Sequence, residues 1–212
     1  MTSAWLFNLG ADVYAWFTGN STWRASCARM AERLAPCDPR LVLHLGCGPG
    51  VSALALAKTL ANARVVGLDA APRMLAQARR RDPDRTVTWL RADAAHLPFR
   101  RGRVDACTGH SVLYLMPDRA AVLAEVRRVL RPGGRLVLME PSARAATLEQ
   151  VLKLSTDPRH LVSVSLWRPF SRLHGRFTEQ SLVDTLERSG FFVCAVEPTL
   201  GGLGLLATAA AC

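Results

Sequence analysis

Three glycines and an acid mark the part of this chain best suited to chemistry. Gly46, Gly48 and Gly50 directly follow an apolar run, and a helical segment begins just after them. Glycine allows sharp turns and a close approach of the backbone to a ligand, and a helix start presents free N–H groups. Asp69 ends the next apolar run, where a carboxylate can accept hydrogen bonds from both hydroxyls of a ribose. Together these residues predict a site for a cofactor that carries a nucleoside.

The spacing of the glycines narrows the kind of cofactor. The chain reads G-x-G-x-G and has Val51 where a dinucleotide-binding turn has its third glycine. No lysine followed by a hydroxyl residue comes after the turn, which excludes a Walker-type phosphate-binding loop. A cofactor with a ribose but no phosphate fits best, and S-adenosylmethionine is the common cofactor of that kind.

The composition predicts a globular chain with a strong positive charge. At 212 residues, 50% of them hydrophobic, it is long enough for one domain with a substantial core. The formal net charge is +10, and every basic residue except Lys58 and Lys153 is arginine. This bias reflects either genome composition or attraction to an anionic partner such as a phospholipid surface, a nucleic acid or an acidic small molecule. Because no helix-turn-helix, RNA-binding or zinc-finger pattern is visible, we expect no nucleic-acid partner.

Cysteine spacing and hydropathy bear on metals and on location. The six cysteines form no C-x-x-C pair and no metal-ligand spacing, so we expect reduced thiols and no metal site. No apolar run is long enough to span a membrane. We therefore expect a cytoplasmic protein and leave open a peripheral attachment to an anionic membrane surface. The pattern gives no indication of an oligomeric state.

The order of the elements predicts an α/β fold. Strands and helices alternate, which predicts a Rossmann-like, doubly wound, mostly parallel seven-stranded sheet. The short link 199–202 predicts that the last two strands form an antiparallel hairpin at the sheet edge. Strands are expected near 41–45, 64–68, 86–91, 103–109, 134–140, 191–197 and 203–209. Helices are expected near 50–61, 71–81, 117–130 and 178–189.

We expect one domain over residues 1–212, built in four parts. One part stands out, because 142–177 is longer than an ordinary connection and rich in Arg, Trp and Phe. It is either a surface cap anchored by aromatics, or a substrate lid or membrane-touching surface. The parts are an N-terminal helical cap (1–40), a cofactor-binding core (41–140), the lid insertion (142–177) and the last helix with its hairpin (178–212).

Four motifs in order carry a resemblance to a known family. The segments 42–50, 66–75, 91–99 and 130–136 resemble the cofactor loop, the ribose-binding segment, the adenine-binding segment and the turn before the fifth strand of class I S-adenosylmethionine-dependent methyltransferases. The match is strong over 41–140 and looser beyond it. The resemblance is closest to the branch with quinone-biosynthesis methyltransferases and bacterial phosphatidylethanolamine N-methyltransferases.

The resemblance also implies residues for the cofactor site. Gly46 and Gly48 would let the backbone approach the methionine and ribose parts, and Asp69 would hold the ribose hydroxyls. Met74 would pack on the adenine ring, while Asp93 and the N–H of the next residue would contact the adenine edge. The full set implied for the cofactor is His44, Gly46, Cys47, Gly48, Asp69, Ala70, Met74, Asp93, Ala94, Gly109 and His110.

His44 departs from the family pattern, which usually has Asp or Glu at this position. A neutral histidine can accept a hydrogen bond, but a protonated one would repel the ammonium group of the cofactor. One hypothesis is that cofactor affinity falls as the pH drops through about 6.5, the ordinary histidine pKa. The alternative is a strand residue that is satisfied by neighbouring backbone.

The methyl acceptor is predicted less sharply than the donor. His110 and Tyr114 are candidates for a general base, although methyl transfer requires one only if the acceptor must lose a proton. A phospholipid head-group amine is the first expectation, and a quinone or other small aromatic metabolite is the alternative. A basic nucleic-acid-binding protein or a non-catalytic cofactor-binding protein is the alternative of another class. The residues expected to contact the acceptor are Tyr14, Trp16, Tyr114, Trp167 and Arg168.

Overall fold

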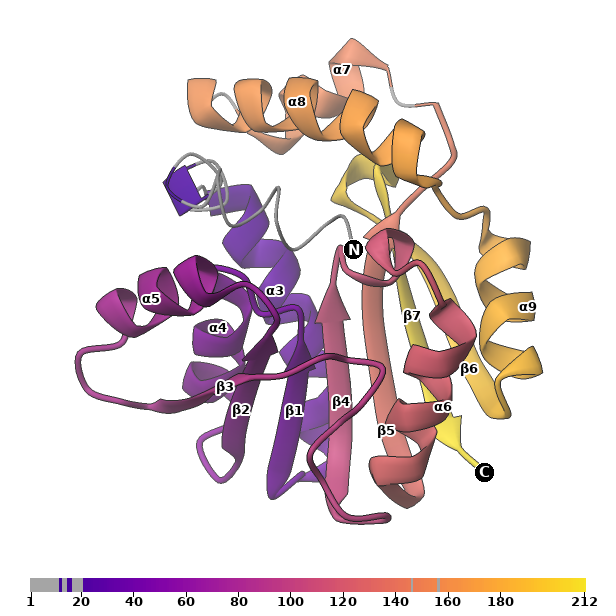
Figure 1. Cartoon of the computed structure of the whole chain (residues 1–212). Helices are drawn as coiled ribbons and strands as arrows, with labels where there is room; N and C mark the ends of the chain where they lie inside the picture. Colours follow the sequence, from indigo (N-terminus) through magenta and orange to yellow (C-terminus); the bar gives the residue numbers. More distant parts are fainter. Residues whose placement is uncertain (1–11, 13–14, 17–20, 146, 156) are drawn as a thin grey trace.

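A seven-stranded sheet runs through the middle of the computed structural model, which describes residues 12, 15–16, 21–145, 147–155 and 157–212. The strands lie in the order β3-β2-β1-β4-β5-β7-β6 (Figure 1). The first five are parallel, and β7 runs antiparallel to both β5 and β6. The predicted fold class, with its C-terminal hairpin at the edge, is confirmed. The strands are β1 (Leu41–Leu45), β2 (Arg64–Asp69), β3 (Val87–Arg91), β4 (Val104–His110), β5 (Leu130–Pro141), β6 (Phe191–Thr199) and β7 (Gly204–Ala211).

Helices cover both faces of this sheet because the strands alternate the direction of their apolar side chains. In β1, Val42 packs into a core with α3 (Ser21–Leu34), α4 (Val51–Thr59) and α5 (Pro72–Arg81). The next residue, Leu43, packs on the opposite face into a second core. That core includes residues of α6 (Arg119–Val129) and α9 (Glu179–Arg188).

The start of β5 differs most from the prediction. β5 begins at Leu130 rather than at residue 134, so the predicted turn Arg131-Pro132-Gly133-Gly134 lies inside the strand. The register shifts here, because Val104 pairs with Leu130 while Ala106 pairs with Arg135. The turn is therefore present as a bulge within β5, since the chain pairs with β4 both before and after it.

The lid insertion forms helices that span the top of the sheet. It contains α7 (Leu148–Leu154) and the long α8 (Pro158–His174). Ser142 and Phe177 pair through an isolated bridge, so the insertion leaves and re-enters the fold at one point. Figure 1 shows α8 crossing above the ends of the parallel strands that point toward it.

The N-terminal cap is described mainly through α3, which continues into the short turn η1 (Ala35–Cys37). Pro36 lies in that turn, directly after the end of α3. Two further short turns, η2 (Leu113–Leu115) and η3 (Leu200–Gly202), lie after β4 and between β6 and β7. α3 also reaches the end of β4, where the hydroxyl of Ser26 lies 2.7 Å from Nε2 of His110.

Candidate functional site

The glycine turn after β1 has a backbone that only glycine adopts without strain. Gly46, Gly48 and Gly50 have φ values of 57°, 51° and 91°, all in the left-handed region. A Cβ on Gly46 would lie 2.3 Å from Cγ2 of Val112, so packing as well as conformation excludes a side chain. Cys47 is buried in the same turn, and its N–H donates to the Leu68 carbonyl at 2.9 Å.

Gly109, at the end of β4, is a glycine for a packing reason. A Cβ there would lie 2.6 Å from Cγ1 of Val112 and 2.9 Å from Cδ2 of Leu138. The same valine therefore fills the space beside both Gly46 and Gly109. It joins the two strand ends that the resemblance assigns to the methionine part of the cofactor.

Asp69 holds the glycine turn against the end of β2. One carboxylate oxygen accepts the N–H of Gly48 and the other accepts the N–H of Ala71, both at 2.8 Å. Burial raises the pKa of Asp69, while the backbone N–H groups act in the opposite direction. Ala70, beside it, is exposed. Each carboxylate oxygen has two lone pairs, so Asp69 keeps acceptor capacity for the hydroxyls of a ribose.

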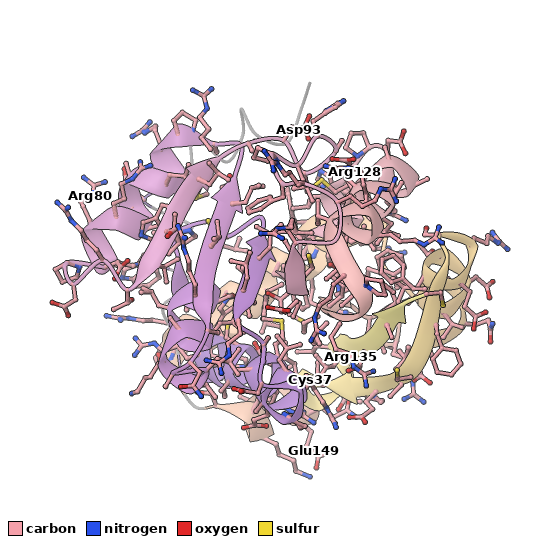
Figure 2. The ribbon with its side chains drawn as sticks, turned by 90° about the horizontal axis from the view of Figure 1, so that it is seen from below. Cys37, Arg80, Asp93, Arg128, Arg135 and Glu149 are labelled. Atoms are coloured by element: carbon pink, nitrogen blue, oxygen red, sulfur yellow. The ribbon has the colours of Figure 1, made fainter. Side chains whose placement is uncertain are left out.

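The residues predicted for the adenine differ in their accessibility. The side chain of Asp93 is 68% exposed and lies at the rim of the molecule in Figure 2. It accepts the Ala95 N–H at 2.9 Å, an arrangement that fixes the turn. Ala94 and Met74 are both buried. A ring can contact Met74 only after the atoms that cover it move, so its predicted role stays a prediction.

His44 is a neutral, buried residue of β1. Its Nδ1 lies 2.7 Å from the hydroxyl of Thr108 on the neighbouring strand β4, so its partner is a side chain rather than backbone. Burial lowers the pKa of His44 to about 3. The hypothesis that His44 gains a proton as the pH falls through about 6.5 is therefore wrong for the folded chain.

We expect S-adenosylmethionine to bind with equal affinity, within about twofold, at about pH 8 and about pH 5.5, because His44 stays neutral at both values.

The stability of the fold, unlike the affinity, should depend on pH in this range. The unfolded chain protonates His44 with an ordinary pKa and the folded chain does not, so stability falls as the pH drops below about 6.5. Calorimetric titration and thermal unfolding at both pH values measure the two effects. A loss of affinity at the lower pH in the wild type, absent from His44→Gln, would contradict the expectation.

His110 links the sheet to the N-terminal cap. Its Nε2 lies 2.7 Å from the hydroxyl of Ser26 on α3, and its ring centroid is 4.3 Å from that of Trp23. Burial lowers the pKa of His110 to about 3, and nearby His44 adds to the effect. Such a weak base is poorly matched to proton abstraction near neutral pH. The contacts of His110 instead support a positioning role.

The predicted acceptor contacts fall into two groups. Trp167 of α8 packs edge-on against Trp23 with ring centroids 6.3 Å apart, and so approaches the His110 side of the site. Tyr114 is buried in η2 and packs edge-on against His174, near the other end of α8. The structure therefore brings Trp167 to the Trp23 ring. Tyr114 packs on His174 instead.

The other residues predicted to contact the acceptor are Arg168, Trp16 and Tyr14, and their contacts give less support to that role. Arg168 donates to the carbonyls of Ser142 and Arg144 at 3.0 and 2.8 Å, so it ties α8 to the segment after β5. Trp16 is 49% exposed, and the guanidinium of Arg159 lies 5.2 Å from its ring centroid. Tyr14 lies outside the described residues.

Glu140 is a site residue that sequence reasoning missed. It ends the apolar run of β5, is 0% exposed, and accepts three backbone N–H groups of the loop after β4. These donors are Val112 and Leu113, at 3.1 and 2.8 Å from one oxygen, and Tyr114, at 3.2 Å from the other. Burial raises the pKa of Glu140 to about 7, although the three N–H groups oppose the shift. An acid directly after the apolar run 136–139 was the available signal.

The described part of the chain shows neither a metal cluster nor a membrane span. Within it, no group of three or more His, Cys, Asp or Glu residues is arranged to hold a metal ion. None of the helices described is both long enough and apolar enough to cross a bilayer. All six cysteines are free thiols, and Cys27, Cys47 and Cys107 are buried.

Comparison with known proteins identifies the central segment. Residues 43–138 match the family model of a methyltransferase domain. A demethylmenaquinone methyltransferase of Thermus thermophilus is 40% identical over 137 residues, covering 64% of this chain and 57% of that protein. A trans-aconitate 2-methyltransferase of Azoarcus sp. is 41% identical over 105 residues, covering 49% of this chain and 40% of that protein. The chain thus spans only about half the length of these curated relatives.

Solved structures support the fold over nearly the whole chain. The [4+2]-cyclase SpnF superposes with a TM-score of 0.75 at 17% identity and covers 98% of this chain and 94% of that one. A S-adenosylmethionine-dependent methyltransferase from Aquifex aeolicus gives a TM-score of 0.66 at 17% identity, covering 86% and 89% of the two chains. These identities support the fold alone, and the cyclase shows that one fold serves different reactions.

Proposed function

We propose that this chain, whose residues 43–138 match the model of a methyltransferase domain, transfers a methyl group from S-adenosylmethionine to a small neutral metabolite. A quinol or another small aromatic is the best candidate. One observation carries the donor half of the proposal. The left-handed glycine turn after β1 is held by Asp69 at the end of β2, and this carboxylate keeps lone pairs for ribose hydroxyls.

The residues of the donor side have distinct roles in this proposal. S-adenosylmethionine supplies an electrophilic methyl group. Asp69 would accept hydrogen bonds from the ribose, and Asp93 with the Ala94 N–H would contact the adenine edge. Gly46 and Gly48 would admit the rest of the cofactor close to the backbone. Because charge is dispersed when a sulfonium transfers its methyl, these residues act by positioning and by excluding water.

The acceptor side favours a neutral molecule over the amine of a phospholipid. The aromatic rings of Trp23 and Trp167 and the neutral His110 form one contiguous group between α3, β4 and α8. A cationic amine would need a carboxylate or an aromatic cage as its partner, and the rings of Trp23 and Trp167 instead pack edge-on against each other. Glu140 is the nearest buried acid along β5, and its oxygens are already engaged with three N–H groups. The printed functions of the relatives, on demethylmenaquinone and on trans-aconitate, also concern small metabolites.

We expect methyl-labelled S-adenosylmethionine to label a quinol fraction when the purified chain is incubated with reduced menadione analogues that lack the ring methyl. Parallel reactions contain trans-aconitate or vesicles of phosphatidylethanolamine. The Asp69→Ala variant, defective on the donor side, is the control for background transfer. Label that appears only in the phosphatidylethanolamine vesicles would replace the proposed acceptor, and cofactor binding without transfer to any of the three would remove the proposal.

A further inference from the structure

A small cavity lies between α3, α8 and η3, outside the residues assigned to the cofactor. Its open space is about 20 Å³, which is enough for one group of the size of a water molecule. Trp23 forms part of its wall, and the same ring lies 4.3 Å from that of His110 at the end of β4. The cavity is therefore one side chain away from the strand end where the methionine part of the cofactor is expected.

Within the described part of the chain, three buried polar atoms in the lining of this cavity have no hydrogen-bond partner. They are Oγ1 of Thr22, Nε2 of His160 and Nε1 of Trp167. Thr22 and His160 are 9% and 3% exposed, so bulk water does not serve them. An unsatisfied buried polar group costs about 1–3 kcal/mol, and three such groups lining one cavity indicate a missing polar occupant.

The hydrogen-bonding character of these atoms defines that occupant. Trp167 can only donate, and the hydroxyl of Thr22 can donate or accept. The backbone of Val151 hydrogen-bonds the ring of His160 in the direction that raises its pKa, as a carbonyl acceptor does. We assign the proton of the neutral ring to Nδ1, toward the Val151 backbone, and this leaves Nε2 as the acceptor in the cavity. The occupant must accept from Trp167 and donate to His160, as a hydroxyl does.

The residue types of the lining decide which polar group of a metabolite can occupy the cavity. Among the residues that the structure describes, none that lines the cavity is Asp, Glu, Lys or Arg. An ammonium or carboxylate group would enter without a counter-charge, at a large desolvation cost. A carbonyl or ether oxygen would satisfy Trp167 but would leave His160 without a donor. Of these groups, a neutral hydroxyl is the one that satisfies both Trp167 and His160.

We infer that this cavity binds a hydroxyl group of the methyl acceptor and thereby selects hydroxylated neutral molecules. The inference rests on the proposed function and specifies its substrate class. The hydroxyl is an anchor rather than the methylated atom. Thr22, His160 and Trp167 are specificity-determining residues, and a bound water takes the same position when no acceptor is present.

The test compares two probes that differ in one hydrogen-bond donor. The protein is saturated with S-adenosylhomocysteine and titrated calorimetrically with 1-naphthol, which has a hydroxyl, and with 1-methoxynaphthalene, which does not. The wild type is expected to bind 1-naphthol about tenfold more tightly, the value of one buried hydrogen bond. Thr22→Val and His160→Phe are each expected to reduce this ratio at least about threefold. Thr185→Val, on α9, is the matched control and should leave the ratio unchanged.

The outcomes distinguish this inference from the proposed function. Equal affinity for the two probes, no binding of either, or a ratio that Thr22→Val and His160→Phe leave intact would overturn the hydroxyl site. So would a crystal structure with 1-naphthol in which water alone occupies the cavity, because that result identifies a structural water site. Methyl transfer to a quinol would still stand in any of these cases. Conversely, a tenfold preference without methyl transfer would preserve the hydroxyl site and remove the proposed function.

Discussion

Replacing Asp69 by alanine is expected to weaken S-adenosylmethionine binding by about 100-fold or more. Each hydrogen bond from a ribose hydroxyl to a carboxylate contributes about 1.5–3 kcal/mol, so the loss of two costs at least about 3 kcal/mol. The substitution also removes the acceptors for the N–H groups of Gly48 and Ala71, which hold the glycine turn in place. Both losses act on the cofactor site.

A series at this position separates the two contributions. Asp69→Asn keeps the size of the side chain and one acceptor oxygen, so its affinity should fall between those of the wild type and Asp69→Ala. Asp84→Ala, at an exposed position beyond α5, is the control and should bind as the wild type does. Affinity is measured by calorimetry, and thermal unfolding verifies that each variant is folded. Wild-type affinity in folded Asp69→Ala would contradict the assignment of the ribose to this strand end.

Replacing Glu140 by glutamine is expected to destabilise the fold by about 2 kcal/mol and to loosen the loop after β4. The amide nitrogen of glutamine cannot accept a hydrogen bond, so at least one of the N–H groups that now bond to Glu140 is left unsatisfied in a buried site. For a chain of this size, the melting temperature should fall by roughly 4–8 °C. The amides of Val112, Leu113 and Tyr114 should exchange with solvent about 30-fold faster.

The burial of Glu140 determines the pH at which Glu140→Gln is measured, and an exposed glutamate provides its control. Burial raises the pKa of Glu140 to about 7, so ionisation costs stability as the pH rises through that value. Measurement at about pH 5, close to the carboxyl pKa of the unfolded chain, keeps most of this cost from masking the loss of the hydrogen bonds. Glu197→Gln makes the same chemical change in an exposed ion pair with Arg33 and should cost under about 1 kcal/mol. Equal melting temperatures and exchange rates for wild type and Glu140→Gln would show that Glu140 does not hold the loop.

Local patterns were enough to predict the fold and the glycine turn to which the donor is assigned. β1 was expected and found at 41–45, because a short apolar run that ends in a glycine turn is typical of a buried strand. The short hairpin link required an antiparallel pair, and β6 and β7 form one. Gly46, Gly48 and Gly50 could be recognised because left-handed backbone selects the residue type directly. β5 was predicted less well, since its bulge depends on pairing with β4.

The features that the sequence pattern could not predict depend on contacts between distant parts of the chain. His44 meets Thr108 across 64 positions, and His110 meets Ser26 across 84. Their low pKa values come from burial, which no local pattern specifies. Glu140 acquires its three N–H donors, and the cavity its polar lining, only when segments far apart in sequence pack together. The methyl donor could therefore be predicted from residue types and spacing, whereas the inferred acceptor required the packing of α3 and α8 over the sheet.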